Sequence, residues 1–154
     1  MLCLIYTPAI DLDTDLFQSR VLLSKLKTNK LEEVMIELPE ALTLAKQINE
    51  RLAGKVVRST EAAHSPHKFT WYHDDPAEYP AKLMDNIVLS ARGVGMFVEV
   101  TLSGSMLLFS DGVNLRLHPN AGAIPAKHQL LINFEDGTSL SASVAMYGCV
   151  VCWG

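Results

Sequence analysis

One helical stripe of apolar residues stands out along the chain. Its members recur at three- and four-residue steps: Ala41, Leu44, Ala45, Ile48 and Leu52. Polar residues fill the other positions, so one helix face is expected in the core and the other in solvent. Pro39 suits the first helical turn, where its missing N–H has no partner to lose, and Gly54 suits a left-handed cap. The pattern predicts a helix that begins at Leu38 or Pro39 and ends before Gly54.

In the second half of the chain the apolar period changes from 3.6 to two. Alternation over residues 96–102 leads into Ser103-Gly104 and then residues 105–109, which predicts a hairpin. Alternation on both sides of Asp136-Gly137, a strong two-residue turn signal, predicts a second hairpin.

Shorter apolar stretches predict additional strands. These strands cover residues 55–62, 68–72, 113–118 and 148–153. The turn at Asp74-Asp75-Pro76 predicts the cap of a short helix near residues 77–84. The fold class is therefore mainly β (α+β): a two-layer antiparallel β-sandwich of about eight strands, with one long and one short flanking helix.

Chain length fits one domain with an additional front segment. A chain of 154 residues buries roughly 68–70% of its unfolded surface, which is enough for a core without disulfides or metals. Residues 1–34 have a looser pattern and an acidic patch, so we expect an N-terminal extension, with a docked helix as the alternative. We expect the domain to span residues 35–154 and Met35 to be the natural start.

Composition and short motifs indicate where in the cell the protein is located. No apolar run approaches the roughly 18–20 residues that a membrane span needs. The apolar start of the chain is too short for a signal peptide and lacks a basic flank. Cys3, Cys149 and Cys152 do not make a disulfide framework. We expect a soluble, cytoplasmic protein that makes no membrane contact.

Residues 35–43, MIELPEALT, precede the predicted helix and the sequence Gly-Lys-Val-Val. This arrangement resembles the opening Met-Pro-Glu-Leu-Pro-Glu of the formamidopyrimidine-DNA glycosylase and endonuclease VIII family. The matching residues are Glu37, Leu38, Pro39 and Glu40. The resemblance runs from Met35 to the chain end and implies the same sandwich. It also implies the N-terminal, catalytic-domain-like part of a DNA glycosylase and AP lyase of base excision repair, a hydrolase acting on oxidised bases in damaged double-stranded DNA.

In that family a proline amine, exposed by removal of the initiator Met, attacks the sugar, and the adjacent glutamate acts as acid and base. The resemblance places Met35, Ile36, Glu37 and Glu40 at the catalytic positions. Schiff-base chemistry needs a free amino group, and Ile36 has only a peptide nitrogen. A chain starting at Met35 would carry an amine one residue out of register, because bulky Ile36 hinders Met removal. We therefore expect no activity in this form.

The resemblance also implies DNA-binding positions. The family's phosphate-binding hairpin lysine falls near Val94, so Arg92 is the candidate substitute. The family's void-filling loops correspond to residues 110–112 and 145–148, where Met146 and Tyr147 are candidates and Tyr147 is the plausible stacking wedge. Lys127 is a further candidate contact.

Net charge argues against a self-sufficient nucleic-acid binder. The whole chain carries −4, and from Met35 onward nine Lys or Arg stand against twelve Asp or Glu, which leaves −3. The family's helix–two-turn–helix module and zinc finger belong to a later part of the chain, so we expect a truncated protein without a cofactor. The alternative function is a non-catalytic module that binds DNA lesions or a protein partner.

Two groups of residues have the chemistry of metal ligands. The first combines His64-x2-His67 with His73, Asp74 and Asp75. Pro66 breaks any helix that would align the two histidines, so we interpret this stretch as a polar loop. The second is Cys149-x2-Cys152, whose members face opposite sides of a strand and have no second pair. The sequence predicts no metal site.

Overall fold

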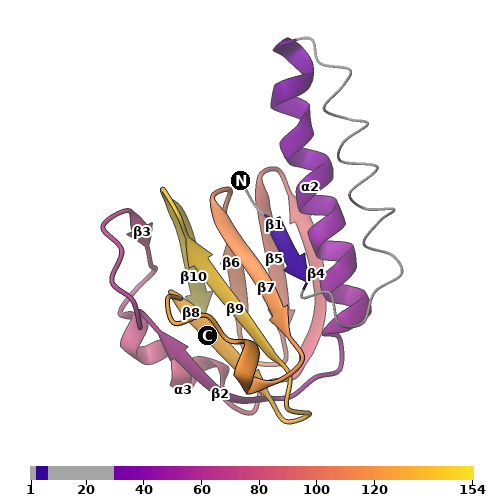
Figure 1. The fold of residues 1–154 in the computed structure, drawn as a ribbon. Coiled ribbons are helices and arrows are strands. Elements are labelled where there is room, and N and C mark those ends of the chain that lie inside the picture. The colour runs from indigo at the N-terminus through magenta and orange to yellow at the C-terminus, as the bar shows by residue number, and fades with distance from the viewer. Residues whose placement is uncertain (1–2, 7–29) are drawn as a thin grey trace.

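The computed structural model describes the backbone of residues 3–6 and 30–154 and the side chains of residues 40–154. Ten strands lie in this part of the chain: Cys3–Tyr6 (β1), Val57–Ala62 (β2), Thr70–Trp71 (β3), Val88–Val94 (β4), Phe97–Leu102 (β5), Met106–Phe109 (β6), Val113–His118 (β7), Leu130–Phe134 (β8), Ser139–Val144 (β9) and Gly148–Trp153 (β10). They form two five-stranded sheets, in the orders β1-β7-β9-β8-β2 and β3-β10-β6-β5-β4 (Figure 1).

Two α-helices flank the sheets, Lys30–Arg51 (α2) and Tyr79–Leu83 (α3), and two 3-10 turns accompany them, Pro76–Glu78 (η2) and Ala121–Ala123 (η3). Helix α2 packs against β4 and β5, and α3 lies against β2. Buried side chains from both sheets and both helices form one apolar core. The predicted mainly β fold with a long and a short helix is confirmed.

The structure has more strands than the sequence predicted. A β pattern was expected from Ile87 onward, but β4 was given no bounds as a separate strand, because a register shift between Val88 and Ser90 places its buried residues, Val88 and Ala91, three positions apart. This irregularity removes the period of two. Both predicted hairpins are present, as β5–β6 and β8–β9. The sheets are not wholly antiparallel, since β1 pairs parallel with β7 and β3 parallel with β10.

Helix α2 begins earlier than predicted. We expected a start at Leu38 or Pro39, but the helix begins at Lys30 and continues through Pro39 to Arg51. Pro39 removes one backbone donor, and residues 30–37 are mostly strong helix formers, which accounts for the additional turns. Gly54 has a φ of +85°, as expected for a left-handed cap. In Figure 1 the first turns of α2 project past the sheets.

Two features fix α2 on the edge strand β4. The Asn49 side-chain Nδ2 donates to the Ala91 carbonyl at 2.8 Å, and the Ala91 N–H donates to the Asn49 side-chain Oδ1 at 2.6 Å. At Gly93 a Cβ would lie 3.0 Å from the Leu42 nitrogen and 3.1 Å from the Ala41 carbonyl carbon. Glycine therefore lets the helix backbone approach the strand more closely than a residue with a Cβ would.

The domain boundary at residue 34 stays a prediction, because residues 7–29 lie outside the described part of the chain. Of the described segment before that boundary, β1 pairs with β7. Among the described residues, no helix is both long enough and apolar enough to cross a membrane.

Candidate functional site

The predicted catalytic positions lie on helix α2. Met35, Ile36 and Glu37 are part of its backbone, and their side chains lie outside the described residues. Glu40 is half-buried on the same helix. The nitrogen of Ile36 is a peptide nitrogen within a continuous helix, so this segment presents no free amine.

Arg92 lies on β4 with a side chain that is 71% exposed, and its Nε donates to the Glu99 carboxylate at 2.6 Å. This hydrogen bond raises the pKa of the guanidinium. Glu99 on β5 therefore occupies part of the donor capacity that a phosphate would use. The β4–β5 turn beside this pair exposes Val94, Met96 and Phe97.

Met146 and Tyr147 form the turn between β9 and β10, where they are 74% and 57% exposed. The segment containing β3 lies beside this turn, because the Gly148 N–H donates to the Phe69 carbonyl at 3.1 Å. Phe69 and Trp71 are also exposed. We call the four residues Phe69, Trp71, Met146 and Tyr147 the aromatic tip. The Lys68 ammonium lies 5.4 Å from the centre of the Phe69 ring, which adds a cation to this surface.

The structure does not bring all the predicted DNA contacts together. Met146 and Tyr147 are adjacent, whereas Arg92 lies on β4, at the opposite edge of the sheet from β3. Lys127 is exposed in the loop before β8. These roles stay predictions.

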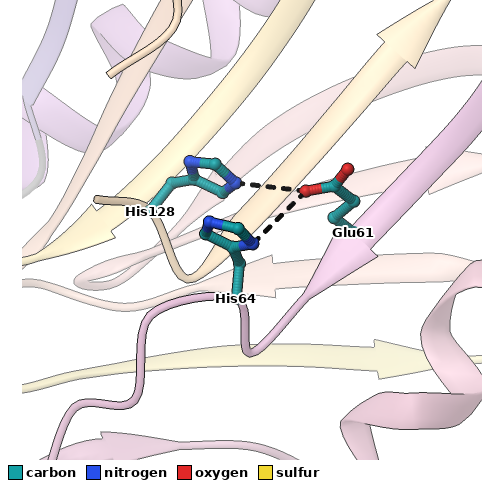
Figure 2. Close-up of side chains that lie close together, drawn as sticks. All are labelled: Glu61, His64 and His128. Atoms are coloured by element: carbon teal, nitrogen blue, oxygen red, sulfur yellow. Dashed lines mark ion pairs between the residues drawn. The ribbon is translucent and has the colours of Figure 1, made fainter. Parts of the chain in front are cut away.

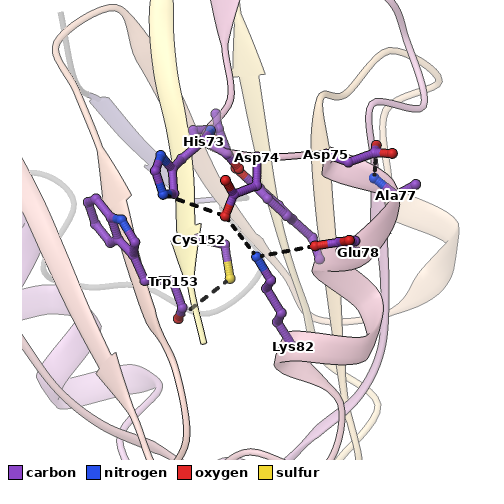
Figure 3. Close-up of polar contacts among 10 residues, drawn as sticks. His73, Asp74, Asp75, Ala77, Glu78, Lys82, Cys152 and Trp153 are labelled. Carbon is purple, nitrogen blue, oxygen red and sulfur yellow. Dashed lines mark hydrogen bonds and ion pairs between the residues drawn. The ribbon is translucent and has the colours of Figure 1, made fainter.

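The histidines proposed from sequence as one possible cluster separate in the structure. His73 lies 3.5 Å from the Asp74 carboxylate, which also pairs with Lys82 of α3 at 3.3 Å (Figure 3). Asp75 accepts from the Ala77 N–H at 2.9 Å and caps η2, as predicted. These contacts hold the loop before η2 against α3, so they have a structural explanation.

Sequence reasoning missed a second cluster. Figure 2 shows Glu61 at the end of β2, His64 in the following loop and His128 in the loop before β8, with the Glu61 carboxylate close to a nitrogen of each ring. Glu61 Oε2 lies 3.6 Å from His64 Nδ1 and 3.5 Å from His128 Nε2. His128 is 4% exposed, whereas the other two side chains are exposed. The local signal was Glu61-x2-His64, but the third member is distant in sequence.

The two cysteines of β10 face opposite sides of the strand, as predicted. Cys149 is half-buried and Cys152 is fully buried. Burial raises the pKa of the Cys152 thiol to about 11, so this thiol is protonated and unreactive near neutral pH.

Comparison with solved structures identifies similar folds. The chain is similar to Lactococcus lactis Fpg (MutM) in complex with DNA containing an oxidised pyrimidine, with a TM-score of 0.63 and 20% identity over 75% of this chain and 43% of that one. Similar values apply to MutM bound to DNA containing carbocyclic 8-oxo-G, with a TM-score of 0.62 and 22% identity. The L. lactis Fpg complex with abasic-site DNA has a TM-score of 0.62 and 20% sequence identity to this chain.

No family model and no curated protein sequence matches the chain. The chain spans about 43% of the length of the Fpg chains that it matches. The part matched is the N-terminal region, which agrees with the resemblance stated from sequence. The chain therefore has the fold of the N-terminal region of the Fpg (MutM) DNA glycosylases.

Proposed function

We propose that this chain is a glycosylase-like domain that contacts damaged double-stranded DNA without carrying out Schiff-base chemistry. The fold supports the first part, since the similar Fpg structures hold DNA with an oxidised pyrimidine, 8-oxo-G or an abasic site. The likeness extends to under half of those proteins, so binding by this chain alone is expected to be weak.

One observation supports the proposed loss of Schiff-base chemistry. Helix α2 is continuous from Lys30 to Arg51, so Met35 and Ile36 lie inside it. A peptide nitrogen has its lone pair delocalised into the carbonyl and cannot form an iminium with an opened sugar.

The aromatic tip supports DNA contact. Its four side chains are exposed at one end of the sandwich, next to Lys68. Exposed aromatic rings stack on unstacked bases, and apolar side chains wedge between base pairs that a lesion has weakened. The chain is acidic overall, so any electrostatic contribution must come from local cations such as Lys68, Lys127 and Arg92.

Two assays on the whole chain test this proposal. The first incubates it with duplexes containing 8-oxoguanine, formamidopyrimidine or an abasic site, with borohydride to trap a Schiff base. We expect neither strand cleavage nor an adduct. An adduct with the whole chain would contradict the loss of chemistry. A chain starting at Met35 is the comparison, since it has a primary amine; an adduct that persists in Glu37→Gln and disappears when the Met35 amine is blocked would show that this amine reacts.

The second assay is a salt titration of binding to lesion-containing and undamaged duplexes. Tyr147→Ala should weaken lesion binding by about tenfold, because one stacked base contributes about 1–3 kcal/mol. Met84→Ala is the matched control, since Met84 is a similarly exposed apolar residue outside the aromatic tip. Equal losses of lesion affinity in both variants would contradict the proposed DNA contact by the aromatic tip.

A protein-interaction module is the second candidate. The net charge of −4 disfavours phosphate, and exposed aromatic and Met side chains are typical of protein interfaces. The same titration separates the candidates. Absence of any salt-dependent DNA affinity would leave the protein-interaction function.

A further inference from the structure

We propose that Glu61, His64 and His128 bind a divalent transition-metal ion, for which Zn²⁺ is the best match. Their ligand atoms, Oε2, Nδ1 and Nε2, all lie within 4.8 Å of one another. The carboxylate oxygen is 3.6 Å from the His64 nitrogen and 3.5 Å from the His128 nitrogen. Ligands about 2.0–2.1 Å from a tetrahedral Zn²⁺ are about 3.3–3.5 Å apart, which is close to the separation of the carboxylate oxygen from each imidazole nitrogen.

The state of His128 is that of a metal ligand. Its Nδ1 lies 3.0 Å from the Pro125 carbonyl oxygen, which can only accept, so in the neutral ring Nδ1 carries the hydrogen. Nε2 is then the atom with the free lone pair. It is buried without a hydrogen-bond partner and faces Glu61 and His64 (Figure 2). Metal-binding histidines are commonly oriented in this way, through a hydrogen bond from the other ring nitrogen to a carbonyl.

A network of hydrogen bonds holds the two segments that carry the ligands. The Ala63 N–H donates to the Gln129 carbonyl at 2.7 Å, and the Ser65 N–H donates to the His128 carbonyl at 3.1 Å. In return, the His128 backbone N–H donates to Ser65 Oγ at 3.3 Å. The Gln129 side-chain Nε2 donates to the Ser65 carbonyl at 3.0 Å. The loop after β2 and the loop before β8 are therefore fixed to each other before any ion binds.

One ring must move on binding. The His64 and His128 rings are stacked, with centroids 4.5 Å apart and an angle of 9° between their planes. Lone pairs lie in the ring planes, so two parallel rings do not aim at one point. The His64 side chain is 51% exposed and can turn, whereas buried His128 stays fixed. Two imidazoles and one carboxylate leave a fourth position for water, as in sites with three protein ligands.

The test uses the whole chain and Zn²⁺ alone, titrated against a chromogenic chelator in a buffer that does not bind metal. We expect one ion per chain and a melting temperature that rises with Zn²⁺ concentration. Co²⁺ should give the visible absorption of a four-coordinate site. His64→Ala and Glu61→Gln are the informative variants because both side chains are exposed, so neither substitution removes core packing.

Each variant should lower the Zn²⁺ affinity by about tenfold or more and abolish the rise in melting temperature. His73→Ala is the matched control, since it removes an exposed histidine next to Asp74 outside the cluster, and it should leave both readouts unchanged. No binding to the wild-type chain would overturn the proposal. So would binding that survives both His64→Ala and Glu61→Gln, or that is lost in His73→Ala.

Discussion

The two edge strands β4 and β2 are held in different ways. Strand β4 is covered by helix α2 through apolar packing, a glycine contact and one side-chain amide. Strand β2 is contacted by the short helix α3 and carries polar pairs at both ends: Lys55 pairs with Asp136 before the strand begins, and Glu61 lies beside His64 and His128 where it ends.

This difference shows which kind of contact a single sequence reveals. Apolar packing of α2 produces a periodic stripe that is visible along the chain. Polar contacts between residues far apart in sequence produce no period. The first edge should therefore contribute most to stability and the second should contribute less, with more dependence on pH and on bound ions.

The largest effect is expected at the β4 edge. Ile48 is 1% exposed in the centre of the stripe, so Ile48→Ala leaves a cavity and should lower the free energy of unfolding by about 2–5 kcal/mol. Chemical denaturation measures this value. Leu42→Ala on the same helix is the control: Leu42 is 55% exposed, and the substitution should change stability by about 0.5 kcal/mol or less.

Deleting residues 1–34 should cost far less than Ile48→Ala if these residues are an extension. Melting curves of the two variants compare them directly. If the deletion unfolds the protein while Ile48→Ala hardly changes its stability, the front segment is integral to the fold. Helix α2 is then not the main support of this edge.

A smaller effect is expected from Gly93→Ala, at the closest approach of α2 to β4. The new methyl group would lie 3.0–3.1 Å from backbone atoms of Leu42 and Ala41, which cannot rotate away. The helix must shift, at a cost of about 1–3 kcal/mol. Ser90→Ala, at an exposed position of the same strand, is the control for denaturation. Equal stability of the two variants would show that helix and strand are not in close contact.

At the β2 edge, Asp136→Asn tests the polar support. Burial alone would raise the pKa of Asp136, but hydrogen bonds from Lys55 and Thr138 outweigh it and lower this pKa to about 2. The ionised carboxylate therefore stabilises the fold above its unfolded pKa near 4, and this contribution disappears as the pH falls towards 2. The side chain is 46% exposed, so screening limits the loss at pH 7 to about 1 kcal/mol or less.

Thermal melts of wild type, Asp136→Asn and the neighbouring control Glu135→Gln between pH 2 and 7 measure this contribution. The wild type and Asp136→Asn should converge at the acidic end. A stability difference that stays constant over the whole range would mean that the charge of Asp136 is not its cause.

The smallest effect is expected from Glu61→Gln in the presence of a metal chelator. Glu61 is exposed, and without an ion its carboxylate lies 3.5–3.6 Å from two imidazole nitrogens. The free energy of unfolding at neutral pH should change by about 0.5 kcal/mol or less. A much larger loss in chelator would mean that the carboxylate supports the β2 edge by itself.

Local and periodic features were predictable from the sequence. The buried stripe of α2, the two hairpins and the cap at Asp75 all depend on residues close together in the chain. The predicted start of α2 was wrong, because the prediction gave Pro39 more weight than the helix-forming residues before it. The bounds of strand β4 were not predicted, because its register shift hides the alternation.

The Glu61, His64 and His128 cluster could not be predicted in the same way. Its third ligand comes from the loop before β8, and only the pairing of β2 with β8 brings that loop to the end of β2. The catalytic positions have the opposite character. The motif around Glu37 can be recognised from a few adjacent residues. That match does not require a free amine at the correct position, whereas the chemistry does.

The position of β10 between β3 and β6 has a consequence for synthesis on the ribosome. Its partners, Thr70–Trp71 and Met106–Phe109, emerge long before Gly148–Trp153 does. Until then the second sheet lacks an interior strand, and β6 has an unpaired side that can bind other nascent chains. Because pairing over such sequence separations closes long loops, folding is expected to be slow, on the millisecond-to-second scale. A translational pause before residue 148 should therefore increase aggregation.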